Sequence, residues 1–207
     1  DMELAWSIGF PKAVSMRSQP AVVGDTLFLP VGESDGRMFA FNISGDEPCL
    51  KWVYEQETTL RSSAAYGELP DGTKAVLVGD RTGKVHAVDA MTGELIWKGD
   101  AALFGGSMIT GTPVLYGDKV FVPVSMAEIM MGANNAHECC KTHGGVVALD
   151  AATGEPALPP LEGSWEEGFR EGDYSGLFRS QCSITIEKPQ LAPSSTRRFA
   201  AQPSRGP

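Results

Sequence analysis

The sequence predicts an all-β fold in which about three four-stranded antiparallel blades stand side by side as part of a β-propeller. Two observations predict this fold. A pattern of about 45 residues occurs three times, and each copy contains short runs rich in Val, Leu and Phe that are separated by Gly-containing turns. Four short strands in about 40–50 residues is the size of one propeller blade. Helical spacing of apolar residues is absent from all three copies, which excludes a helical repeat.

The first blade is expected at residues 11–52. Its first half, SQPAVVGDTLFLPV at 18–31, reads as two strands around a Gly-Asp turn, and its second half, MFAFNISGDEPCLKW at 38–52, is a degenerate second pair. The second blade is expected at residues 60–97, where SSAAYGELPDGTKAVLVGD is followed by VHAVDAMTGELIW. A tight turn at Met91-Thr92-Gly93 separates its last two strands, because glycine supplies the positive φ that such a turn needs.

The third blade is expected at residues 107–158. GTPVLYGDKVFVPV at 111–124 and VVALDAATGEP at 146–156 repeat the two halves, and a long insertion from Ser125 to His143 separates them.

Several repeated residues have a structural interpretation. Trp6, Trp52 and Trp97 are 46 and 45 residues apart, and we expect these rings to pack between neighbouring blades. Asp89 and Asp150 are expected to hydrogen-bond the turn backbone near Thr92 and Thr153, and Asn42 to do the same in the first blade. His86 is interpreted as a packed residue and not as a ligand.

The remaining composition limits the function and the domain organisation. The 207 residues carry a net charge of −9, which argues against binding to nucleic acid or to an anionic membrane surface. The sequence contains no run of 18 apolar residues, so no membrane-spanning helix is predicted. Four cysteines are too few for a disulfide scaffold. We expect a propeller segment at 1–160, a poorly patterned region at 161–187 and a disordered, proline-rich tail at 188–207.

The repeated A-[LV]-D-x-x-T-G-E pattern, followed by Trp in the second copy, resembles the pyrroloquinoline-quinone (PQQ) repeat of quinoprotein dehydrogenases. The sequence is most similar to polyvinyl-alcohol-dehydrogenase-like proteins, in residues 17–24, 109–114, 138–140 and 145–150. The likeness covers roughly residues 4 to 158. The adjacent Cys139 and Cys140 are its most specific mark. Such propellers have more than three blades, no repeat follows Pro160, and Leu158 stands where the third repeat would have Trp, so the resemblance implies a fragment.

The resemblance implies a PQQ-dependent dehydrogenase that takes a hydride from a small or polymeric alcohol. It further implies cytochrome c as electron acceptor, Ca²⁺ in the intact protein, and a periplasmic or secreted location. No Asp or Glu matches a catalytic-base motif, so no catalytic residue is assigned. The alternative is a non-catalytic scaffold propeller, similar to the lipoprotein that assists outer-membrane protein assembly.

Strand polarity locates the candidate site. The first strand of a blade starts, and its second strand ends, at the same face of the ring. Arg17 and Arg61 directly precede first strands, and Thr110 takes a similar place in the third blade. Cys139 and Cys140 lie in the long insertion, so all five residues are expected at one mouth of the ring. A guanidinium pairs well with a carboxylate, and PQQ carries three carboxylates.

Three interpretations of the cysteine pair remain open. A vicinal disulfide would close a strained ring, because adjacent Cα atoms are only about 3.8 Å apart, and its flat surface could stack on the quinone. A metal site could use His137, Cys139, Cys140 and His143. Two reduced thiols are the third possibility. The three methionines of the insertion, Met126, Met130 and Met131, suggest loop packing, with a pocket or a partner surface as the alternative.

Overall fold

The computed structural model describes residues 2–11, 13, 16–32, 36–131, 134, 136, 142 and 144–157. These residues belong to one compact unit, Asp1–Pro160. The boundaries expected at 161–187 and 188–207, together with Cys139 and Cys140, lie outside the described residues. No helix in the described part is long and apolar enough to cross a membrane.

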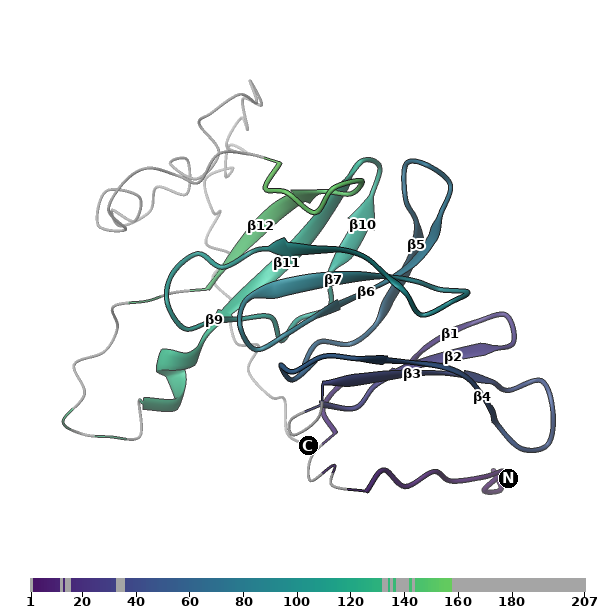
Figure 1. Cartoon of the computed structure of the whole chain (residues 1–207). Coiled ribbons are helices and arrows are strands. Elements are labelled where there is room, and N and C mark those ends of the chain that lie inside the picture. The colour runs from purple at the N-terminus through teal and green to yellow at the C-terminus, as the bar shows by residue number, and fades with distance from the viewer. Residues whose placement is uncertain are drawn as a thin grey trace, which may run out of the picture. The chain divides into compact units, whose positions relative to one another are not determined.

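The described chain folds into three antiparallel sheets that follow one another along the sequence (Figure 1). Each of the first two is a four-stranded meander, which confirms the predicted blades. The first blade contains β1 (Ala21–Val23), β2 (Thr26–Pro30), β3 (Arg37–Asn42) and β4 (Cys49–Glu55). The second blade contains β5 (Ala65–Glu68), β6 (Lys74–Gly79), β7 (Lys84–Asp89) and β8 (Leu95–Asp100).

The third blade keeps the same plan but divides its strands differently. It contains β9 (Ser107–Met108), β10 (Val114–Tyr116), β11 (Lys119–Met126) and β12 (Gly145–Asp150). Both β9 and β10 pair with β11, so together they form a first strand that is broken in the middle. A fourth strand begins as in the other blades, because Pro156 bridges to Leu149, but its continuation lies beyond the described residues. The long insertion of the third blade begins with the short 3-10 helix η2 (Ala127–Met131).

Burial of both sheet faces explains the continuous apolar sequence of the middle blade. On β6, Ala75 and Leu77 pack in a cluster with Val120 and Val122 of the third blade. The alternate residues Val76 and Val78 pack in a second cluster, which includes Phe28 and Trp52 of the first blade. Because successive side chains of a strand point to opposite faces, a strand that is covered on both faces is mostly apolar along its whole length and does not alternate with polar residues.

Each of two tryptophans packs against a turn of the following blade. Trp52 donates a hydrogen bond from Nε1 to the carbonyl of Ala90 at 3.1 Å, and Trp97 donates to Ala151 at 2.9 Å. A Cβ on Gly93 would lie 2.7 Å from Trp52 Cδ2, and a Cβ on Gly154 would lie 2.4 Å from Trp97 Cε3. These turns need glycine both for its positive φ and for this close approach, and the predicted packing between blades is confirmed for both rings.

Trp6 differs from the other two tryptophans. It lies outside any strand and is 36% exposed, whereas Trp52 and Trp97 are buried. Spacing alone therefore did not predict its environment.

The repeated Asp side chains accept hydrogen bonds from turn backbone, as expected. Asp89 Oδ1 accepts from the N–H groups of Met91 and Thr92, and Asp150 Oδ1 accepts from those of Ala152 and Thr153. Asn42 does the same for Ser44.

Candidate functional site

Hydrogen bonds link the backbone segments that contain Arg17, Arg61 and Thr110, of which the first two precede β1 and β5 and the third lies between β9 and β10. The hydroxyl of Ser18, next to Arg17, donates to the carbonyl of Arg61 at 3.2 Å. The Arg61 N–H donates to the carbonyl of Gly79, where β6 ends.

Thr110 reaches the same place from the third blade. The N–H of its neighbour Ile109 donates to the carbonyl of Asp80 at 2.9 Å, one peptide group beyond Gly79. Arg17 and Thr110 are exposed, and Arg61 is half-buried. Three adjacent blades thus each carry one of these residues at the same end, while Cys139 and Cys140 lie outside the described residues and cofactor contact stays a prediction.

The hydroxyl of Thr110 pairs with a second hydroxyl. Thr110 Oγ1 and Ser125 Oγ are 2.6 Å apart, and Ser125 lies near the end of β11 where the long insertion starts. The two hydroxyls form a short polar edge beside the insertion. Sequence analysis treated Ser125 only as the start of the insertion.

The insertion contains a buried carboxylate that sequence analysis did not single out. Glu128 on η2 is 8% exposed, and its Oε2 accepts hydrogen bonds from the N–H and the hydroxyl of Thr142 at 2.7 and 2.5 Å. The Thr142 hydroxyl also contacts the Met126 sulfur. Of the other methionines, Met130 and Met131 are exposed, so the expected loop packing applies to Met126 alone.

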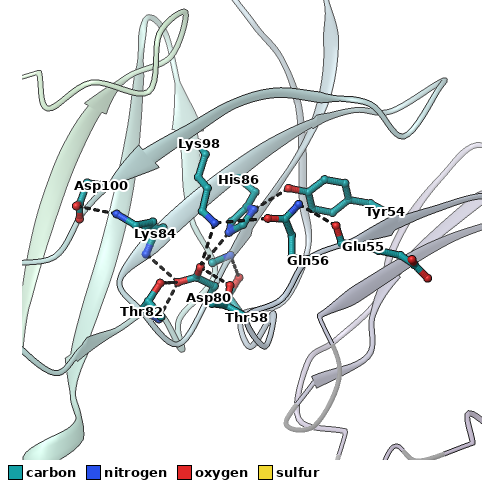
Figure 2. A network of polar contacts seen from close by, with 12 residues as sticks. Tyr54, Glu55, Gln56, Thr58, Asp80, Thr82, Lys84, His86, Lys98 and Asp100 are labelled. Atoms are coloured by element: carbon teal, nitrogen blue, oxygen red, sulfur yellow. Dashed lines mark hydrogen bonds and ion pairs between the residues drawn. The ribbon is translucent and has the colours of Figure 1, made fainter.

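A buried polar network crosses from the first blade to the second (Figure 2). The hydroxyl of Tyr54 on β4 lies 2.7 Å from Nδ1 of His86 on β7, and His86 Nε2 lies 3.1 Å from Oδ2 of Asp80. Asp80 and His86 are fully buried. The neutral tautomer of His86 with hydrogen on Nε2 satisfies both contacts, since Tyr54 then donates and Asp80 accepts.

The Asp80 carboxylate is the centre of this network. Its Oδ1 accepts from the N–H and hydroxyl of Thr82 and from the N–H of Lys84, and its Oδ2 also accepts from the Thr58 hydroxyl at 2.9 Å. Burial alone would raise the pKa of Asp80, but the hydrogen bonds from His86, Lys84 and Thr82 outweigh it and hold the pKa well below its usual value. Asp80 is therefore a buried carboxylate anion at neutral pH.

Tyr54 shows the opposite effect. Burial and, secondarily, the negative charge of Asp80 raise the pKa of Tyr54 to about 12. The phenol therefore stays protonated and can donate to His86 over the whole physiological range. The expected packed role of His86 is confirmed, but its two charged or polar partners were not foreseen.

Beside the network lies an open hollow lined by residues 55–58 and Lys98. Lys98 Nζ is 4.0 Å from Asp80 Oδ2 and 3.5 Å from the side-chain oxygen of Gln56. Within the described residues, no three His, Cys, Asp or Glu side chains are grouped closely enough to hold a metal ion. The histidines and cysteines of the alternative metal site are not among those residues.

One family model matches most of the described chain. It is the PQQ_2 model, described as outer membrane protein assembly factor BamB, and it matches residues 1–138. The chain belongs to the PQQ_2 family. The match covers the first two blades and most of the third, so the repeat identified in the sequence is the repeat of this family.

Curated relatives of this PQQ_2 chain are dehydrogenases. It is 34% identical over 157 residues to the polyvinylalcohol dehydrogenase of a Pseudomonas species, covering 74% of this chain and 24% of the relative. It is 32% identical to the polyvinylalcohol dehydrogenase of Sphingopyxis sp. strain 113P3, covering 74% and 23%. The chain thus spans about a quarter of the length of these relatives.

A solved structure gives the same picture for the PQQ_2 blades. A europium-containing methanol dehydrogenase is similar with a TM-score of 0.58 and 25% identity, over 75% of this chain and 26% of that one. This similarity supports the blade architecture and the resemblance to quinoprotein dehydrogenases.

Proposed function

We propose that these blades form part of a PQQ-dependent alcohol dehydrogenase of the polyvinyl-alcohol-dehydrogenase kind. The observation that carries the proposal is the meeting of Arg17, Arg61 and Thr110 at one end of three adjacent blades. The similarity to two polyvinylalcohol dehydrogenases supports the same assignment.

The chemistry of these residues suits PQQ, which is a flat tricarboxylate. A guanidinium holds a carboxylate through two parallel hydrogen bonds, and the Thr110 hydroxyl adds a donor or acceptor. Because the chain carries a net charge of −9, a trianionic ligand needs such a local basic clamp. When bound, PQQ supplies the two-electron acceptor for oxidation of an alcohol, while the protein binds and orients it. Cys139 and Cys140, from the insertion, are proposed to complete the site.

A Ca²⁺ ion is proposed for the complete site. Ca²⁺ takes about six to eight oxygen ligands, and Glu128 offers one buried carboxylate at the start of the insertion. The Glu128 side chain fits a hard cation in chemistry, and the other ligands would come from groups beyond those that the structure describes. Cytochrome c as electron acceptor, a small or polymeric alcohol as substrate, and a periplasmic or secreted location complete the proposal.

A non-catalytic scaffold is the second candidate. The description of the matching family model as an outer-membrane assembly factor favours it. A scaffold would bind partners through its loops and would have no need of PQQ, so binding of the cofactor separates the two candidates.

The test uses a complete ring. Residues 4–158 replace the matching segment of the Pseudomonas polyvinylalcohol dehydrogenase, and PQQ is titrated into the folded chimera and its variants. We expect Arg17→Ala and Arg61→Ala each to weaken binding by roughly 10- to 150-fold, the equivalent of about 1.5–3 kcal/mol for hydrogen bonds to a charged group. The isolated 207-residue chain is expected to bind weakly or not at all.

The control variant is Lys74→Gln, because Lys74 forms an exposed ion pair with Glu68 at a turn of the second blade. Its affinity for PQQ should equal that of the unsubstituted chimera. Unchanged affinity in both arginine variants would remove the site assignment. A folded chimera that binds no PQQ would favour the scaffold.

A further inference from the structure

The polar network occupies positions that are apolar in the other two blades. Register aligns the end of β6 with the ends of β2 and β11, so Asp80 corresponds to Val31 and Val124, both buried. His86 corresponds in the same way to Phe39 and Val147. The repeat therefore folds with apolar side chains at these places, and the buried charge of the second blade is not required to make a blade.

The third member of the set follows the same rule. Lys98 pairs with His86 across β7 and β8, and Val53 pairs with Phe39 across β3 and β4. Lys98 thus stands where the first blade has a valine. Ionisable groups replace apolar ones at three neighbouring positions, all facing the seam between the first and second blades, which we call the first seam.

The second seam, between the second and third blades, closes differently. Gly99 takes the place of Tyr54 in the second blade, and a Cβ there would lie 2.2 Å from the carbonyl oxygen of Gly154. Gly79 is equally tight, with Ile109 Cγ2 2.2 Å from its Cβ position. At these two positions the blades of the second seam approach closely through glycine, whereas the Tyr54 and His86 side chains span the first seam.

The first seam also separates the two arginines of the proposed site. Arg17 precedes the first blade, and Arg61 precedes the second. Two hydrogen bonds tie their segments across the seam, from the Ser18 hydroxyl to the Arg61 carbonyl and from the Gln19 N–H to the Ser63 hydroxyl at 2.8 Å. The Tyr54–His86–Asp80 chain, from β4 to β7 and the end of β6, crosses the same seam with directional hydrogen bonds.

We propose that Asp80 is a positioning residue, which sets the spacing of Arg17 and Arg61 by fixing the first seam through His86 and Tyr54. This inference rests on the proposed PQQ site. Asp80 suits the role because its backbone carbonyl bonds Ile109 of the third blade while its carboxylate bonds His86 and Thr58. One residue therefore links the second blade to both neighbours.

Directional bonds explain why the network is polar. A buried hydrogen-bonded network adds less stability than apolar packing of the same volume, but it favours one arrangement of the groups that it joins. A clamp for a rigid tricarboxylate needs such a fixed distance, because two guanidinium groups must meet two carboxylates at once. The first seam therefore has a polar side-chain network at the positions where the third blade places Val124 and Val147 on the second seam.

The experiment compares an apolar network with a rewired one. The apolar variant combines Tyr54→Phe, His86→Leu and Asp80→Val, and the rewired variant is Asp80→Asn, whose amide can donate to His86 in its other tautomer. In the chimera described above, we expect the apolar variant to bind PQQ about tenfold more weakly. Asp80→Asn should remain within about threefold of the unsubstituted chimera.

Hydrogen exchange in the 207-residue chain supplies a readout that does not depend on the cofactor. The Gln19 N–H crosses the first seam and the Ile109 N–H crosses the second. In the apolar variant, exchange at Gln19 should become about tenfold faster while exchange at Ile109 and the thermal midpoint stay unchanged. Lys74→Gln should change neither amide.

Each outcome decides one question. Unchanged PQQ affinity in a folded apolar variant would overturn the positioning role, as would equal acceleration of both amides, which indicates general loosening. Loss of affinity in Asp80→Asn equal to that of the apolar variant would also overturn it. If the unsubstituted chimera binds no PQQ, the proposed function fails instead, and the exchange rates still show whether the network fixes the first seam.

Discussion

Substitution of Gly93 by alanine tests how strongly a tryptophan of one blade is bound by the turn of the next. Gly93 has a φ of 79°, and a Cβ there would lie 2.7 Å from Cδ2 of Trp52. Real carbon atoms do not approach so closely, so the ring must move. Such a movement weakens the hydrogen bond from Trp52 Nε1 to the Ala90 carbonyl.

The magnitude has three parts. A left-handed conformation costs a residue with a Cβ roughly 1–2 kcal/mol. Insertion of one methyl group into a close-packed site costs roughly 1–3 kcal/mol. A lost hydrogen bond adds about 0.5–1.5 kcal/mol. We therefore expect Gly93→Ala to lower the free energy of unfolding by about 3–6 kcal/mol.

Gly72→Ala is the matched control, because it lies in another turn of the same blade. Its φ is 89°, but no atom lies within 4 Å of the Cβ position. Only the conformational cost remains, so the expected loss is about 1–2 kcal/mol. Urea unfolding of the 207-residue chain, followed by tryptophan fluorescence and circular dichroism, measures both. Equal losses in the two variants would refute the packing argument.

Three further predictions concern ionisable groups and thiols. Between about pH 10 and pH 12 a tyrosine of the unfolded chain loses a proton that Tyr54 of the folded chain retains. The free energy of unfolding should therefore fall by about 2–3 kcal/mol as the pH rises through this range. Urea unfolding at a series of pH values measures this fall, and Tyr54→Phe should remove it. Because the pKa of Asp80 is lower in the folded than in the unfolded chain, its ionised carboxylate should stabilise the fold above about pH 4, and this stabilisation should be lost as the pH falls. The thermal midpoint of Asp80→Asn should therefore fall less in acid than that of the unsubstituted chain. An equal fall in both proteins would contradict the low pKa of Asp80. Cys139 and Cys140 should be joined in protein made in an oxidising compartment and should be easy to reduce; mass spectrometry after thiol labelling checks this, and two free thiols in natively purified, oxidised protein would exclude the bond.

The blades were predictable because their signals are local. A Gly-containing turn between two runs of Val, Leu and Phe specifies a hairpin, and the carboxylates of Asp89 and Asp150 bond their own turns. Strand polarity then sufficed to place Arg17, Arg61 and Thr110 at one end, because the direction of each strand follows from its order in the blade.

The network could not be predicted in the same way. Tyr54 and His86 are 32 residues apart, and their contact depends on how two blades pack. His86 was correctly predicted to be packed, but its partner Asp80 lies in a Gly-Asp pair that reads like the turns at residues 24–25 and 117–118. Once the structure has aligned the three copies, the exception is visible, because Asp80 stands where the other two blades have a buried valine. Glu128 was missed because a single Glu in an irregular insertion has no pattern around it.

The tryptophan contacts give the array of blades a polarity. Each of the first two blades carries a tryptophan that packs against a glycine turn of the next blade. In the middle blade, the tryptophan and the glycine turn therefore lie on opposite faces of the sheet. The middle blade contributes both kinds of contact, a glycine turn toward the first blade and a tryptophan toward the third, and both lie between Asp89 and Trp97. A chain built this way can lengthen by duplication of a whole blade, because the copied blade contains both the glycine turn that contacts the preceding blade and the tryptophan that contacts the following one. The same arrangement confines the effect of a substitution in a glycine turn to one interface. Such a substitution disturbs the packing against the preceding blade and leaves the tryptophan contact with the following blade unaltered.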